Sequence, residues 1–202
     1  MDFQLSQIPT EAERVVLRKL ALCSAQEGCK ILEIGSWCGD SAVILGKVAR
    51  EKNGHLYCVD WWRGSIGTEL MEIAEKTEVY SVFWQRIRSE KLEDVVVPIR
   101  GRSDVVSEIL KTRCFDLIFI DGDHRYESVL TDIRGYGPLV RKGGILCGHD
   151  CEGRVSDYDQ GFLYKGKEFD CYETVHCGVV LAVGSIFADY SINRSIWSVR
   201  AI

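Results

Sequence analysis

Two carboxylates and an imidazole follow a short apolar run of this sequence. The run at residues 115–120 is rich in aromatic and β-branched residues, and Asp121, Asp123 and His124 come within the next four positions. Such a run is typical of a strand buried on both faces of a parallel sheet. Open α/β sheets bind ligands at the carboxyl ends of their strands. We therefore expect these side chains to face a ligand, where a histidine can accept a proton at neutral pH.

A glycine turn earlier in the chain has the features of a second ligand-binding segment. Gly35 and Gly39 separate the apolar run 30–34 from a helical pattern that begins at Asp40. Glycine lets a backbone approach a ligand closely, and the amides at a helix start face it. The acid Glu33 would repel a pyrophosphate but suits a cation such as the amino group of a methionine moiety. The spacing is Gly-x-x-x-Gly, and this combination favours S-adenosylmethionine over a dinucleotide.

Two further apolar runs also end in polar residues. Asp60 follows the run 55–59, at the distance from the glycine turn at which a nucleotide-binding fold usually offers an acid to a ribose. His149 and Asp150 follow the run 145–148. Polar residues beside turns at successive strand ends are the way in which such folds build a nucleotide site.

The elements that position these residues alternate along the chain. We expect strands at 30–34, 55–59, 95–99, 115–120 and 145–148, and helices at 11–26, 40–49, 126–140 and 178–187, with further helical patterns within 61–93 and after 101–104. Residues 190–192 and 196–201 alternate in polarity and predict a closing hairpin, whereas 151–175 fits no element and is long enough for a functional loop. The predicted fold class is α/β, a doubly wound, Rossmann-like and mainly parallel sheet with a C-terminal antiparallel hairpin.

Composition limits the class of protein and its partners. With 202 residues, we expect one domain that spans 1–202. The net charge of −5 argues against a nucleic-acid partner, which needs a clustered basic surface. No apolar stretch is long enough to span a membrane, and residues 1–6 lack the features of a signal peptide, so we expect a cytoplasmic protein with free thiols at its nine cysteines. A small-molecule partner follows, and a homo-oligomer stays open.

Two motifs resemble a known family. Residues 33–43, Glu-Ile-Gly-Ser-Trp-Cys-Gly-Asp-Ser-Ala-Val, resemble the first motif of class I S-adenosylmethionine-dependent methyltransferases, above all catechol O-methyltransferase and its relatives. Residues 120–126, Ile-Asp-Gly-Asp-His-Arg-Tyr, followed by 143–150, Gly-Gly-Ile-Leu-Cys-Gly-His-Asp, are similar to the metal-dependent O-methyltransferases, including those that methylate macrolide sugars. The resemblance spans roughly residues 30–150 and implies S-adenosylmethionine and a divalent metal, first of all Mg²⁺, as cofactors.

The resemblance implies roles for particular residues. Around the methionine part of the cofactor it places five residues: Glu33, Gly35, Ser36, Gly39 and Ser41. It places Asp60 at the ribose, Trp61 and Ser103 at the adenine, and Asp121 at both the cofactor and the metal.

The resemblance also implies a metal centre and a base. The metal ligands are Asp121, His149 and Asp150, with His149 a departure from the Asp or Glu that the family often has at that position. The family places its general base three residues after the metal aspartate, at His124. Methyl transfer from a sulfonium is an in-line displacement, and a hydroxyl acceptor must lose its proton as it attacks. A cation that lowers the hydroxyl pKa and a histidine that takes the proton can act together.

The predicted activity is methyl transfer to a hydroxyl of a small molecule, such as a catechol or a vicinal diol of a sugar. A binding protein that keeps the cofactor pocket without catalysis and a nucleotide-dependent oxidoreductase are the alternatives. These residues can also be interpreted as purely structural. In that interpretation Gly35 and Gly39 form a plain tight turn, and Asp121 and His124 cap a helix. A structural zinc site in the Cys/His segment 147–177 is a further one, although no pair has Cys-x-x-Cys spacing.

Overall fold

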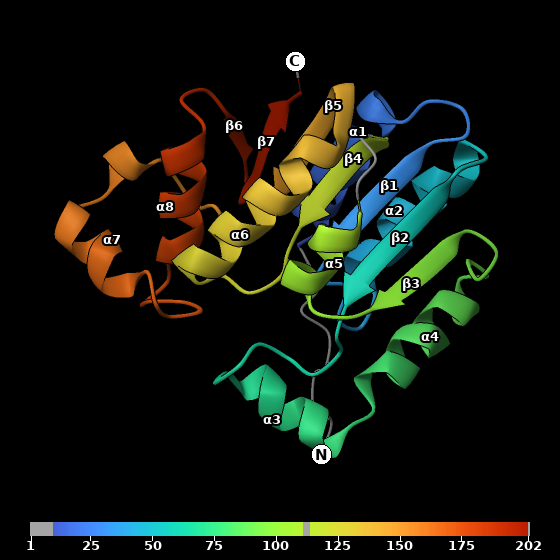
Figure 1. The fold of residues 1–202 in the computed structure, drawn as a ribbon, viewed down its shortest axis with the longest axis horizontal. Coiled ribbons are helices and arrows are strands. Elements are labelled where there is room, and N and C mark those ends of the chain that lie inside the picture. Colours follow the sequence, from blue (N-terminus) through green and yellow to red (C-terminus); the bar gives the residue numbers. More distant parts are fainter. Residues whose placement is uncertain (1–9, 111–113, 202) are drawn as a thin grey trace.

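A seven-stranded sheet forms the centre of the protein (Figure 1). The computed structural model describes residues 10–110 and 114–201, so residues 1–6, on which the signal-peptide prediction depends, lie outside them. The strands are β1 (Lys30–Ile34), β2 (His55–Asp60), β3 (Val96–Arg100), β4 (Phe115–Ile120), β5 (Val140–Gly148), β6 (Ser191–Asn193) and β7 (Ile196–Arg200). Their order is β3-β2-β1-β4-β5-β7-β6, with β1 to β5 parallel and β7 antiparallel to both neighbours. The predicted fold class and closing hairpin are confirmed.

Helices cover both faces of the sheet. One apolar core lies between the sheet and α1 (Glu11–Ser24), α2 (Asp40–Glu51) and α4 (Val79–Ser89), and the other lies under α5 (Ser103–Ile109), α6 (Tyr126–Tyr136) and α8 (Cys177–Ile186). In Figure 1, α5 and α6 lie in front of the sheet and α1 and α2 behind it. Two short helices, α3 (Glu69–Lys76) and α7 (Gln160–Gly166), lie outside these layers, and α7 packs on α8.

Strand β4 runs through the middle of the sheet and is buried along its whole length. Ile118 and Ile120 face one core, and Leu117 and Phe119 face the other. Burying each such side chain contributes about 1.5–3 kcal/mol. This position places the residues that follow β4 at the centre of the sheet edge.

The sequence pattern predicted that the fifth strand starts after the glycine pair 143–144, but these glycines lie inside β5. Strand β5 begins at Val140, five residues before the expected start at residue 145. The strand continues through Gly143, which has a φ of 75°, because the register with β4 shifts there. The preceding helix, expected to reach residue 140, ends at Tyr136 and continues as a 3₁₀ turn, Gly137–Leu139, that contains proline. Proline and glycine both weaken a helix, and glycine can adopt the backbone conformation of a β-bulge.

The loop 151–175 holds more local structure than its sequence predicts. It contains a 3₁₀ turn, Val155–Asp157, and the helix α7, whose first turn is capped by the Asp159 side chain. All nine cysteines are free, as expected. Among the residues 10–110 and 114–201, no helix is long and apolar enough to cross a membrane.

Candidate active site

A cavity of about 360 Å³ opens where β1, β2, β3 and β4 end. Its volume is in the range of pockets that hold small organic ligands, about 300–1,000 Å³. The residues predicted to contact the cofactor that line it are Gly35, Asp60, Trp61, Ser103 and Asp121. Four strand ends that are far apart in sequence therefore meet at one cavity, as the parallel sheet requires.

Gly35 is needed for contact within the protein. It has a φ of 86°, and a Cβ added there would overlap the backbone carbonyl of Asp121. Gly39, also at positive φ, lies against the ring of Phe83 and does not line the cavity. The first glycine lets the turn after β1 lie directly on the end of β4, which sets the floor of the site.

Glu33 is buried beneath this turn, outside the cavity. Its Oε2 accepts a hydrogen bond of 2.5 Å from the Ser36 hydroxyl and one of 3.5 Å from the Cys58 thiol, and Ser41 also bonds the carboxyl. Burial raises the pKa of Glu33 to about 7. Its Oε1 is buried without a hydrogen-bond partner. A buried acceptor of this kind fits a donor such as the amino group expected for the cofactor.

Asp60 holds the wall of the cavity in place. Its carboxylate accepts hydrogen bonds from the backbone N–H groups of Trp37, at 2.8 Å, and Trp62, at 2.6 Å. Both tryptophans have positive φ angles, which are rare for bulky residues, and the Trp62 indole donates to the Trp37 carbonyl at 2.8 Å. Burial raises the pKa of Asp60 despite these bonds. The backbone N–H groups of Ser36 and Trp61 also bond this carboxylate, so ribose hydroxyls would share its acceptor positions with backbone donors.

Asp132 is a cavity residue that the sequence did not reveal. It lies on α6, is 3% exposed and bonds the Ser103 side chain, and burial raises its pKa to about 7. Tyr136, one turn later, donates from its hydroxyl to the Ser103 carbonyl at 2.7 Å. Helix α6 thus anchors the loop expected at the adenine. An acid next to the apolar stripe of a helical pattern is the signal that could have identified it.

The three predicted metal ligands come together beside the cavity. Single ligand atoms of Asp121, His149 and Asp150 all lie within 4.8 Å of one another. His149 Nδ1 lies 3.1 Å from Asp150 Oδ1 and 3.7 Å from Asp121 Oδ1. Asp150 has a φ of 57°, an uncommon conformation that aspartate tolerates better than most residues. Two carboxylates and an imidazole fit a divalent cation, and the imidazole makes Mn²⁺ or Zn²⁺ acceptable as well as Mg²⁺.

Helix α1 reaches this centre through Glu13, in its first turn. Its Oε2 accepts the N–H of Thr10 at 2.7 Å, and its Oε1 accepts the Ser195 hydroxyl at 2.5 Å and lies 3.3 Å from His149 Nε2. Burial lowers the pKa of His149, but the bond to Asp150 and the surrounding carboxylates outweigh it and raise the pKa to about 9.

His124 lies on the same centre and also lines the cavity. Its Nδ1 is 3.0 Å from Asp170 Oδ1, and because a carboxylate only accepts, this nitrogen carries the proton. Its Nε2 is 3.2 Å from Asp150 Oδ2, but at an angle that makes no hydrogen bond, so this buried atom has no partner. Burial lowers the pKa of His124, and Asp121, Asp170 and Asp150 together raise it well above the ordinary value.

The segment after β5 supplies side chains that sequence reasoning did not assign. Asp170 holds His124, and His176 Nδ1 lies 2.5 Å from Glu152 Oε1. The rings of His124 and His176 meet edge to face, with centroids 4.8 Å apart. In the described part of the chain, no cysteine belongs to a group that could hold a metal, so the Cys/His zinc interpretation has no support. Asp123 bonds the N–H and side chain of Arg125 and so shapes the turn before α6.

A family model described as "Methyltransferase domain" matches residues 32–151. The chain belongs to this methyltransferase family. The match covers the glycine turn, all four strand ends of the cavity and the His149–Asp150 pair, and it confirms the resemblance to class I S-adenosylmethionine-dependent methyltransferases.

Solved structures of methyltransferases share the fold. The O-methyltransferase TomG from Streptomyces achromogenes, involved in tomaymycin synthesis and solved with S-adenosylmethionine, is 16% identical over 99% of this chain and 85% of its own, with a TM-score of 0.68. The methyltransferase PaMTH1 from Podospora anserina, solved with S-adenosylhomocysteine, is 14% identical over 96% and 80%, with a TM-score of 0.64. A Clostridium thermocellum protein proposed to be an rRNA methylase is 13% identical over 98% and 99%, at 0.61. Likeness at these identities shows that the chain shares their fold.

Proposed function

We propose that this methyltransferase transfers the methyl group of S-adenosylmethionine to a hydroxyl of a small molecule, a catechol or a vicinal diol of a sugar, with the help of a divalent cation, Mg²⁺ first of all. The observation that carries the proposal is the meeting of His124 and Asp121, which both line the cavity, with Asp150. The net charge of −5 supports a small acceptor over a nucleic acid.

The residues at the cavity have separate roles in this proposal. Asp60 accepts the ribose hydroxyls, while Trp61 and Ser103, the latter held by Asp132, enclose the adenine. Glu33, with Ser36, Gly39 and Ser41 around it, lies beneath the turn that lines the cavity, and its carboxyl with one unpartnered oxygen favours the cationic amino group of the methionine part above it. These contacts orient the sulfonium toward the end of β4.

In the reaction, the acceptor oxygen forms a bond to the methyl carbon as the bond from carbon to sulfur breaks. The hydroxyl proton passes to His124 Nε2, the nitrogen left free because Asp170 holds Nδ1. Asp121, His149 and Asp150 would hold the cation, which would lower the pKa of the acceptor hydroxyl and, with the sulfonium, favour the neutral imidazole that can take a proton.

The test combines cofactor binding with turnover. We expect calorimetry to detect S-adenosylhomocysteine, and labelled S-adenosylmethionine to methylate a member of a panel of catechols and sugar diols in the presence of Mg²⁺. EDTA and His124→Ala abolish turnover, and His124→Ala keeps the S-adenosylhomocysteine affinity. His55→Ala, at an exposed histidine at the start of β2, is the matched control and leaves both unchanged.

Each alternative has its own outcome. Tight S-adenosylhomocysteine binding without methylation of any acceptor supports a non-catalytic binding protein. Full turnover in EDTA removes the metal from the proposal and leaves the base. Binding of NADH that is tighter than binding of S-adenosylmethionine supports an oxidoreductase and overturns the proposal.

A further inference from the structure

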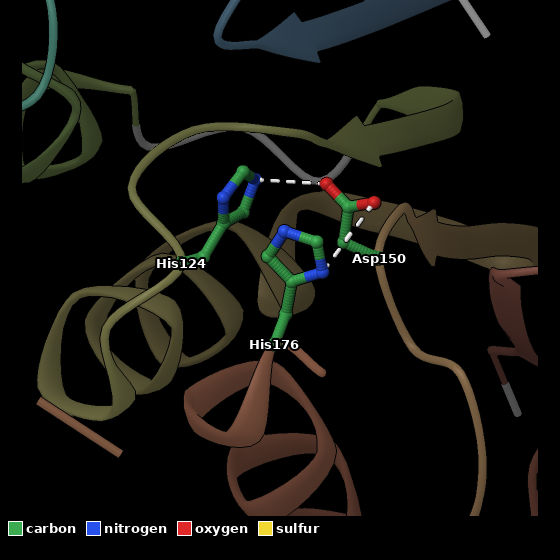
Figure 2. A group of neighbouring side chains, drawn as sticks. All are labelled: His124, Asp150 and His176. Carbon is green, nitrogen blue, oxygen red and sulfur yellow. Dashed lines mark ion pairs between the residues drawn. The ribbon is translucent and has the colours of Figure 1, made fainter. Parts of the chain in front are cut away.

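Two histidines approach the two oxygens of Asp150, which is itself one of the predicted metal ligands (Figure 2). His124 follows β4, Asp150 follows β5 and His176 precedes α8. His124 Nε2 lies 3.2 Å from Asp150 Oδ2, and His176 Nδ1 lies 3.7 Å from Asp150 Oδ1. One ligand atom from each of the three residues falls within 4.8 Å of the other two. The group is separate from Asp121 and His149 but shares Asp150 with them.

The atom that points into this group can bind a metal in the neutral form of the imidazole. His124 Nε2 is buried and makes no hydrogen bond, although a carboxylate oxygen lies 3.2 Å away. Asp170 binds the opposite nitrogen of the same ring at 3.0 Å, which leaves a lone pair on Nε2 of the neutral imidazole. An imidazole held by a carboxylate on one nitrogen and free on the other is the usual arrangement of a metal-bound histidine.

His176 is also held by a carboxylate, but on the same nitrogen that faces Asp150. Glu152 Oε1 lies 2.5 Å from its Nδ1, and the ring packs edge to face on His124. Its side chain is 19% exposed, whereas His124 is fixed between β4 and Asp170, so His176 is the ring that must turn to complete the group. Tetrahedral zinc holds its ligand atoms about 3.4 Å apart, which follows from bonds of about 2.0–2.2 Å. The distance from His124 to Asp150 already fits, and the site closes when His176 turns its Nε2, the nitrogen that Glu152 does not hold, toward the metal.

We propose that His124, Asp150 and His176 form a second metal site, distinct from Asp121, His149 and Asp150, that binds a cation such as Zn²⁺ in preference to Mg²⁺. Two imidazoles and one carboxylate suit borderline transition metals, whereas Mg²⁺ requires oxygen ligands in an octahedral shell. The surrounding carboxylates of Asp170 and Glu152 add negative charge that favours a cation.

Occupancy of this site has a consequence that rests on the proposed function. A metal bound to His124 Nε2 occupies the lone pair that takes the acceptor proton. Zn²⁺ at the second site and proton transfer to His124 therefore exclude one another, and Zn²⁺ inhibits methyl transfer even with Mg²⁺ in excess. The binding of Zn²⁺ itself does not depend on turnover.

The test uses the metal-depleted full chain in excess Mg²⁺, with Zn²⁺ titrated by calorimetry and Co²⁺ followed by its visible absorption. We expect His176→Asn to weaken Zn²⁺ binding at least about tenfold and to remove the tetrahedral Co²⁺ bands, which is the scale of loss seen when a supporting contact of a metal site is removed. His149→Asn, in the other group, keeps the bands, and His55→Asn, exposed on β2, changes nothing.

Equal Zn²⁺ affinity in His176→Asn and the unmodified protein overturns the proposal, as does loss of the Co²⁺ bands in His149→Asn alone. S-adenosylhomocysteine binding and the thermal unfolding midpoint show whether each variant is folded. Where turnover is measurable, the concentration of Zn²⁺ that halves it rises in His176→Asn by the same factor as the dissociation constant. Without any turnover, the proposed function fails and the binding result still decides the second site.

Discussion

Replacement of Glu33 by glutamine tests the charge that is buried beneath the glycine turn. Glu33 is fully buried, and burial raises its pKa from 4.5 to about 7. Between these two pH values the unfolded chain loses the proton while the folded chain keeps it, so the free energy of unfolding falls as the pH rises. At about 1.4 kcal/mol per pH unit, ionisation of this group lowers the stability of the ligand-free protein by about 3 kcal/mol between pH 4.5 and 8.

The Glu33→Gln variant has no proton to lose at this position. We expect its free energy of unfolding, measured by urea denaturation at pH 4.5 and at pH 8, to fall by about 3 kcal/mol less than that of the unmodified protein. All other titrating groups contribute equally to both proteins and cancel in the comparison. Because glutamine carries no negative charge, we also expect weaker binding of S-adenosylhomocysteine at pH 8.

A control at the surface separates this effect from a general loss of charge. Glu75→Gln, at an exposed glutamate of α3, leaves the pH dependence of stability unchanged. If the Glu33→Gln variant and the unmodified protein lose stability in parallel from pH 4.5 to 8, the pKa of Glu33 is not raised in the folded state and the reasoning is refuted.

Two further predictions concern the turn and the base. Gly35→Ala places a methyl group on the Asp121 carbonyl at positive φ and should prevent stable folding, whereas Gly67→Ala, at a φ of 79° with nothing within 4 Å, costs only the backbone strain of about 1–2 kcal/mol. Equal thermal midpoints for the two variants contradict this. Asp170→Asn replaces the carboxylate that accepts from His124 Nδ1 with an amide, whose NH2 group can donate to Nδ1 and favour the other tautomer, so we expect kcat to fall about tenfold or more with unchanged S-adenosylhomocysteine affinity. An unaltered kcat shows that Asp170 does not orient the base.

The sequence predicted the sheet because local pattern and tertiary position agree there. Five of the six residues of β4 are apolar, which favours burial on both faces, and all six, Asp116 included, are buried. Alternation with helical segments then leaves few arrangements other than a doubly wound sheet. The start of β5 was predicted wrongly because a glycine pair indicates a turn, whereas the β-bulge at Gly143 keeps it inside the strand.

The grouping of Asp121, His149 and Asp150 also follows from the sequence. Each lies just after a predicted parallel strand, and the carboxyl ends of adjacent parallel strands meet at one sheet edge. The structure places them within 4.8 Å of one another. The sequence is therefore sufficient to predict which residues lie close together when each of them follows a strand and those strands are neighbours in a parallel sheet.

The sequence by itself determined the fold class, the glycine turn and the strand-end residues of this methyltransferase, since these depend on periodicity and on positions next to strands. Only the tertiary structure decided that Asp170 holds His124 from 46 residues away, that His176 faces Asp150 and that Glu13 reaches His149. These contacts involve a segment without regular periodicity and the first turn of a helix. Their partners are fixed by the packing of α1, α7 and α8 around the sheet, which no local pattern encodes.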